Sequence, residues 1–386
     1  MSEPRSTPDT AAVPARPYIG GQAVLEGVMM RSPHSFAIVV RRRDRSLHVR
    51  ERKMPKDTSG PRGVPFLRGV MSLVDSLRLG SDALKFSAEQ LEKDMDAEER
   101  EQAKKAKDGL IAKTLMTLGQ MVTALGLTLF VLSTADDVPA PETKKKGGAG
   151  MGLTLVLMVL FMWALPQATA AGANRVFKLG FEVQSPQFQA ITGIFKLVIV
   201  IGYLLLIRRM NDIRRVFQYH GAEHKTISTY EANLPLTVEN AKAQTTLHPR
   251  CGTTFLVMVA LMSVLIFTAV GAFMPRIHTG RELLDNVLFF LVKLPFIPVI
   301  AAFTFELQRV FARYCTTGPL RALLVPGFLV QRITTIEPDN DQLEVALASL
   351  RATLFREQGE DTDKSGDVRF ATYDALLKAE RLRPSA

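Results

Sequence analysis

Hydrophobic residues along this chain are gathered into long, nearly uncharged runs that alternate with densely charged stretches. Five runs reach about the 20 residues that an α-helix needs to cross the hydrocarbon core of a bilayer. These runs are Thr114 to Ser133, Met151 to Ala173, Phe188 to Ile207, Thr253 to Met274 and Val287 to Phe305. The pattern predicts a mainly α-helical, polytopic membrane protein.

Charged residues in and around these runs limit how many of them we expect to cross. The polar part before Lys113 and the segment Arg208 to Gly252 are both basic, and basic flanks tend to stay in the cytoplasm. An even number of crossings must then separate them. Lys196 makes Phe188 to Ile207 the weakest candidate, because a lysine near a helix centre costs about 2.5 to 3.5 kcal/mol. We expect four crossings, one dipping or interfacial helix and both termini in the cytoplasm; Lys293 weakens the last run similarly, and five crossings are the alternative.

The polar regions outside the runs predict smaller elements. Short apolar runs typical of β-strands predict a small antiparallel sheet near the N-terminus. They are Gln22 to Met30, Phe36 to Val40 and Leu47 to Arg52. Between Pro65 and Leu91, apolar residues recur at spacings of three and four, which predicts an amphipathic helix lying on the bilayer surface. One apolar stripe near the C-terminus predicts a soluble helix. That stripe is Leu343, Leu347, Leu350 and Leu354.

These elements divide the 386 residues into four regions. Residues 1–17 are expected to form a disordered tail, and residues 18–113 a cytoplasmic β element with amphipathic and charged helices. Residues 114–333 form the membrane region, which includes a His- and Cys-bearing loop over 208–252. Residues 334–386 are expected to form a cytoplasmic helix and a polar tail.

Composition narrows the expected partners. The chain has 48 Lys and Arg against 38 Asp and Glu, a formal charge of +10, which fits either anionic lipid headgroups or nucleic acid. The basic clusters 41–45 and 208–215 border the predicted membrane surfaces, and no basic surface with interleaved aromatic residues is present. We therefore expect the lipid bilayer and its anionic headgroups as partners, and no nucleic acid. Two cysteines exclude a disulfide-stapled secreted scaffold.

A candidate metal site begins with His220-Gly-Ala-Glu-His224, which has the order H-x-x-E-H. The surrounding apolar spacing predicts a helix over 211–231, so the two imidazoles lie one turn apart on one stripe and can share a metal ion. Glu223 can then polarise the metal's water as a general base. The alternative is a pair of core histidines whose ring nitrogens are satisfied by the protein.

His248 and Cys251 follow in the same basic loop, and both are ordinary zinc ligand types. Together with the first two histidines they predict a divalent metal site, with zinc as the metal. Cys251 has two other interpretations, a buried small thiol or a catalytic nucleophile. Glu306 is a candidate to complete the site, and pairing with Arg309 in a solvated turn is its alternative.

The segment from Gly20 to Arg31 interleaves glycines with one carboxylate, Glu26, and one arginine. Glycines permit a bulge or a close backbone approach, so Glu26 and Arg31 are possible additional site residues. We expect this segment to fold back near the His220 helix. A tight strand pair without a chemical role is the alternative.

Five segments, in this order, resemble the YqhQ-like family of bacterial membrane proteins, described as predicted metal-dependent enzymes without an established reaction. The segments are GGQAVLEGVMMR, PFLRGV, YHGAEHKTI followed by YE, HPRCGTTFL and TTIEPDNDQLEVAL. The similarity runs from about Gly20 to Leu350. It implies a bacterial inner-membrane location and a metal site on His220, His224, His248 and Cys251. The chain departs from the family pattern in a longer polar C-terminal tail and in Phe305, where the family has Tyr before Glu306.

Three functions fit these observations. The first is a membrane-embedded, metal-dependent hydrolase with its site at the cytoplasmic interface and Glu223 as general base. The second is a non-catalytic scaffold or assembly factor in which four protein ligands close a structural zinc site. The third is a transporter, for which Lys196 and Lys293 are the evidence. Three protein ligands plus a water favour hydrolysis, whereas four protein ligands favour a structural role.

Overall fold

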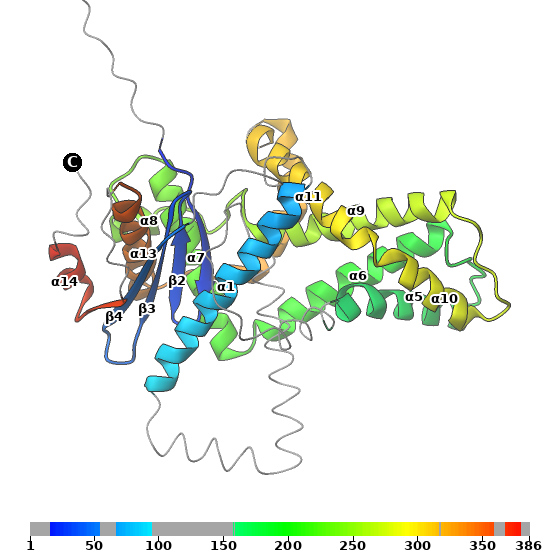
Figure 1. Cartoon of the computed structure of the whole chain (residues 1–386), viewed down its shortest axis with the longest axis horizontal. Coiled ribbons are helices and arrows are strands. Elements are labelled where there is room, and N and C mark those ends of the chain that lie inside the picture. Colours follow the sequence, from blue (N-terminus) through cyan, green and yellow to red (C-terminus); the bar gives the residue numbers. More distant parts are fainter. Residues whose placement is uncertain are drawn as a thin grey trace, which may run out of the picture.

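The structure, a computed structural model, describes residues 16–54, 67–94, 157, 159–315, 318–358 and 367–379. Within these ranges the chain is mostly helical and has one small antiparallel sheet near its N-terminus, as the sequence predicts. The sheet and its covering helices lie at one end, and long apolar helices extend toward the other (Figure 1). The expected run Thr114 to Ser133, the first part of Met151 to Ala173 and residues 1–15 of the expected tail lie outside the described residues.

The sheet is a five-stranded antiparallel meander whose strand order follows the sequence. Its strands are β1 (Gly20–Val24), β2 (Gly27–Arg31), β3 (Ser35–Arg41), β4 (Leu47–Lys53) and β5 (Asp367–Phe370). The predicted strand Gln22 to Met30 is in fact a hairpin, β1 and β2, with a turn at Leu25 and Glu26. Every residue of β1 and β2 is buried, because helices cover both faces.

Alternate residues of the strands face two different cores, as the period of two along a strand requires. Ala37 and Val39 pack with α7 (Asn211–Glu231) and α13 (Asn340–Gln358). Their neighbours on β3 pack instead with α1 (Leu67–Lys93) on the opposite face. The sheet is therefore the middle layer of three (Figure 1).

The amphipathic helix α1 forms close to its predicted bounds, and its C-terminal half packs against the sheet. Leu79, Ala83 and Phe86 are buried against the sheet, because their apolar stripe covers the apolar face that β2 and β3 present there. The expected surface helix is thus a layer of the folded core.

The C-terminal helix α13 is buried more completely than its leucine stripe predicts. Ala346 and Ala348 are buried as well as Leu347, because the helix packs on the sheet and also against the neighbouring α7. Ser349 Oγ donates to Ala37 O at 3.0 Å, and Thr353 Oγ1 donates to Met30 O at 3.0 Å. These bonds tie the helix to the middle strands.

The region after Gln358, which the sequence describes only as polar, supplies the fifth strand. β5 pairs with β4, and Asp367 accepts two hydrogen bonds from Arg50, at 2.8 and 2.6 Å. The short helix α14 (Tyr373–Lys378) follows and buries Leu376. Apolar periodicity could not predict this strand, because pairing along an edge needs backbone groups rather than apolar side chains.

The other end of the molecule consists of long helices. They are η2 (Leu160–Ala164), α5 (Leu165–Val176), α6 (Pro186–Ile207), α9 (Gly252–Phe273), α10 (Glu282–Lys293) and α11 (Phe296–Tyr314). Of the helices described, α6 and α9 are each long and apolar enough to cross a membrane. The expected run Val287 to Phe305 is broken between α10 and α11, which are bent by 51° and count as one further span if taken together. The number of crossings stays a prediction.

Lys196 does not weaken α6 in the way the sequence predicts. The lysine is 2% exposed and its Nζ donates to Ser263 Oγ of α9 at 2.7 Å. The charge therefore faces a neighbouring helix, and the outward surface of α6 stays apolar. Three short helices complete the description, α8 (Val238–Lys242), η3 (Pro319–Leu324) and α12 (Val325–Thr334).

The burial of α13 against the sheet and α7 generates a stability prediction. Leu347 is fully buried there, so Leu347→Ala should lower the free energy of unfolding by about 2 to 5 kcal/mol. Leu234→Ala, at a 39% exposed position after α7, is the matched control and should change it by less than about 0.5 kcal/mol. Chemical unfolding of the detergent-purified full chain measures both. Equal effects of the two substitutions would contradict the central position of α13.

Candidate metal centre

His220 and His224 lie one turn apart on α7, and their ring centroids are 4.4 Å apart. The helix is buried along most of its length because the sheet, α13 and the chain after α12 pack around it. The predicted helix and the predicted alignment of the two imidazoles are therefore both present.

Gly221, between the histidines, allows the chain after α12 to approach α7 closely. A Cβ at this position would lie 2.2 Å from the carbonyl oxygen of Ile336, which no side chain can tolerate. The approach is held by Ile336 N, which donates to Phe217 O at 3.0 Å. The carbonyl of Thr334 is thereby placed 3.0 Å from His220 Nδ1.

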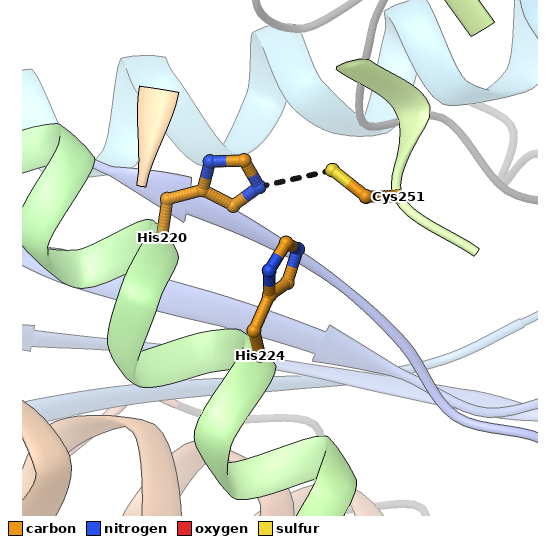
Figure 2. Close-up of side chains that lie close together, drawn as sticks. All are labelled: His220, His224 and Cys251. Carbon is orange, nitrogen blue, oxygen red and sulfur yellow. Dashed lines mark hydrogen bonds between the residues drawn. The ribbon is translucent and has the colours of Figure 1, made fainter. Parts of the chain in front are cut away.

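Cys251 completes a group of three possible metal ligands with the two histidines. The ligand atoms all lie within 4.8 Å of one another, and all three residues are buried. Figure 2 shows the Cys251 sulfur directed at His220, whose Nε2 is 3.3 Å from Sγ. His220 and Cys251, 31 positions apart in the sequence, thus converge as the two motifs predict.

Backbone carbonyls fix the tautomer of both imidazoles. His220 Nδ1 faces Thr334 O, and His224 Nδ1 faces Thr246 O at 2.5 Å. A carbonyl oxygen only accepts hydrogen bonds, so each Nδ1 carries the hydrogen and each Nε2 of the neutral ring keeps its lone pair. Metal-binding histidines are oriented in this way in many proteins.

Burial keeps these rings neutral. Desolvation lowers the pKa of His220 to about 4 and lowers the pKa of His224 well below its ordinary value. Cys251 is the N-cap of α9, where its Sγ accepts from Thr253 N at 3.4 Å, and a helix N-terminus favours negative charge. Two neutral imidazoles and one sulfur are therefore ready to act as ligands.

Glu223 borders the same small cavity as the three ligand candidates. The carboxylate is 4% exposed and packs against Gly21 of β1, where a Cβ would lie 2.7 Å from Oε1. The space left for the centre of a water-sized sphere is about 10 Å³, room for one water molecule or ion. The glycine-rich segment does fold back onto the His220 helix, as expected.

His248 lines this cavity but is directed elsewhere. Its Nε2 lies 3.2 Å from Glu231 Oε2, and its Nδ1 accepts from Arg250 N. Its ring centroid is 5.7 Å from that of His224, and it does not belong to the group of three. The side-chain amide of Gln331 binds the backbone of His248. Its Oε1 accepts from His248 N at 2.9 Å, and its Nε2 donates to His248 O at 2.8 Å.

The other three residues singled out in the sequence do not line the cavity. Glu26, in the β1–β2 turn, pairs with Arg215 and accepts from Tyr219. Arg31 is buried in β2 beside Gly20, and Glu306 lies on α11, outside the group of three.

Sequence reasoning missed the residues that position the ligands. Thr334 and Thr246 act through backbone carbonyls, which every residue has, so no side-chain pattern marks them. Gln331 acts through its side-chain amide, and Gly21 acts because it has no side chain. Of these, Gly21 lies in the Gly-rich segment already noted, whereas Gln331 looks like any polar residue of a helix.

The donor set fits zinc. Two imidazole nitrogens and one thiolate sulfur are ligands that zinc commonly takes, and three protein ligands leave one tetrahedral position for water. The small cavity that these ligand candidates share with Glu223 has room for one ion or water molecule.

The lowered pKa values generate a pH prediction for the metal-free protein. Between pH 4 and 6.5 the unfolded chain binds protons at His220 and His224 that the folded chain does not bind, so stability falls as the pH falls. Acidifying the chelator-treated protein from pH 7 to 5 should lower its unfolding temperature. The loss should be smaller in the double variant His220→Gln with His224→Gln, and unchanged in the control His278→Gln, an exposed loop position. An unaltered loss in the double variant would contradict the assignment.

Comparison with known proteins gives two matches. The family model described as a protein of unknown function (DUF1385) matches residues 64–356. The uncharacterized protein YqhQ of Bacillus subtilis (strain 168) is 31% identical over 341 residues, which cover 88% of this chain and 92% of that protein. No solved structure matches the chain. The chain therefore belongs to the DUF1385, or YqhQ-like, family, as its motifs predict.

Proposed function

We propose that this protein is a metal-dependent hydrolase of the bacterial inner membrane, with a zinc ion held by His220, His224 and Cys251. The observation that carries the proposal is the presence of three ligand types and a separate carboxylate, Glu223, around one water-sized cavity. Catalytic zinc sites keep three protein ligands and one open position, whereas structural sites use four.

The chain's own residues have distinct parts in this reaction. A bound zinc ion would supply a polarised water and a Lewis acid. Glu223, which borders the cavity, takes the proton of the attacking water as general base. Thr334 and Thr246 hold the two imidazoles through their carbonyls. Gly21 leaves room for the carboxylate at the cavity wall.

A structural zinc site is the second candidate. It is favoured by His248, which lines the same cavity and has its ring 5.7 Å from that of His224. Against it, His248 is engaged by Glu231, which also forms an ion pair with Arg250. Turning His248 toward the metal would break its contact with Glu231.

The surface of the long helices supports a membrane location. Ile194 and Val198 of α6 are each 60% exposed, and Leu265 of α9 is 63% exposed, which suits contact with lipid. The basic stretch 208–215 joins α6 to α7, next to this apolar surface, and fits anionic headgroups. We place the metal centre at the cytoplasmic interface; four crossings and cytoplasmic termini stay predictions.

Metal analysis of the detergent-purified full chain tests the ligand set. His220→Asn, His224→Asn and Cys251→Ser should each lose most of the bound zinc, because each removes one of three ligands. His248→Asn should keep it if the site is catalytic. Cys315→Ser, at the other buried cysteine, is the matched control. Full zinc content in the three ligand variants would exclude this site, and loss in His248→Asn would favour the structural role.

The role of Glu223 is tested by a nearly isosteric change. Glu223→Gln should leave the zinc content intact but lower the reaction rate by about 10² to 10⁴, because a general base has been removed. The readout is rescue of a deletion strain's phenotype at equal expression. Glu239→Gln, on α8, is the matched control and should rescue fully. Full rescue by Glu223→Gln would refute the hydrolase proposal while leaving the metal site in place.

A further inference from the structure

Two buried lysines lie together in the helical end of the molecule, away from the metal centre. Lys196 of α6 and Lys293 of α10 are each 2% exposed. Both approach the ring of Phe267 on α9, with their Nζ atoms 5.9 and 4.9 Å from its centroid. The two ammonium groups are therefore neighbours inside the bundle.

The hydrogen-bond partners of these lysines are all neutral. Lys293 Nζ donates to Gln167 Oε1 at 2.8 Å and to Gln189 Oε1 at 3.0 Å. Lys196 Nζ donates to Ser263 Oγ. In the described parts of the chain, no carboxylate lies within ion-pair distance of either lysine. Two like charges buried together are costly unless an anion accompanies them, and such charges in apolar helices mark binding sites.

Trp163 adds a buried donor next to these lysines. Its Nε1 is buried and has no hydrogen-bond partner in the ranges that the structure describes. The ring lies 5.3 Å from Lys196 Nζ and belongs to η2, a π-helical turn of a kind often found at functional sites. The surroundings of the two lysines thus include one donor, Trp163 Nε1, that has room for an acceptor.

An apolar pocket of about 360 Å³ lies between α5 and α10, beside these lysines. This volume is within the range of small-molecule sites, about 300 to 1,000 Å³. Its apolar walls are formed by Ala164, Ala168, Ala171, Leu283, Val287 and Phe290, and Gly172, Arg175, Glu282 and Asn286 also line it. Gln167 also lines the pocket, and the same side chain accepts the hydrogen bond from Lys293. One flexible amide therefore separates the pocket from the buried ammonium group.

We propose that this pocket binds an amphiphile with an anionic head group, a carboxylate or a phosphate, and a single apolar chain. The chain lies between α5 and α10, and the head group replaces Gln167 as the acceptor for Lys293. Leu283 and Val287, which line the pocket, are 79% and 46% exposed, so the pocket opens toward the surface that faces lipid in the proposed membrane location. The site is on the opposite end of the molecule from α7 (Figure 1) and is independent of the metal chemistry.

The first experiment measures binding of a fluorescent fatty acid to the detergent-purified full chain. Binding should be saturable, and oleate should displace the probe. Methyl oleate should displace it about tenfold or more less well, because it lacks the charge that receives the hydrogen bond of Lys293. Inorganic phosphate alone should not displace it. Displacement by inorganic phosphate as efficient as by oleate would mean a small-anion site and would overturn the proposal, as would equal displacement by methyl oleate.

Two variants separate the contributions of charge and shape. Lys293→Gln should weaken binding of the probe about tenfold or more, whereas Lys178→Gln, at an exposed lysine beyond α5, should not. Gly172→Trp should block binding while leaving both buried lysines in place, because Gly172 lines the pocket and no atom lies within 4 Å of its added Cβ. If Lys293→Gln does not fold, Gly172→Trp alone tests whether the probe binds in this pocket. Unchanged binding in Gly172→Trp would overturn the proposal.

Discussion

The contact between α7 and the chain after α12 is the constraint on which the site depends. At Gly221 the backbone of Ile336 comes so close that no Cβ fits between them. This contact puts the Thr334 carbonyl on His220 and thereby selects the nitrogen that faces Cys251. The chain then continues into α13, which packs beside α7 on the same face of the sheet. One glycine thus connects the chemistry of the cavity to the packing of the surrounding layers.

The site is shared between the two ends of the molecule. α7 and β1 contribute the histidines, the carboxylate and the glycine wall, whereas Cys251 is the N-cap of the apolar helix α9. α12 links these parts, because Gln331 holds the loop at His248 and also donates to Thr254 Oγ1 at 3.0 Å. The ligands come from different elements, so their geometry is set by the contacts between those elements.

The sequence predicted the parts of the structure that depend on side-chain periodicity and residue type. These include the sheet, the amphipathic helix, the α7 histidine pair and the convergence with Cys251. Periodicity does not say which partner a given face meets. The pattern therefore did not predict that the sheet covers part of α1, or that Lys196 finds an acceptor on α9. Likewise, loop spacing grouped His248 with the ligands, but only the local geometry shows its ring engaged by Glu231.

The pairing of early strands with late elements has a consequence for synthesis. Ser349 on α13 bonds to Ala37 on β3 across 312 residues, and β5 is added later still. At about 5 to 20 residues per second, a ribosome needs roughly 15 to 60 s to make the chain between these partners. During that time β2 and β3 have their apolar faces uncovered on the α13 side. The newly made N-terminal hairpins therefore have to be protected from aggregation while all the long apolar helices are still being translated.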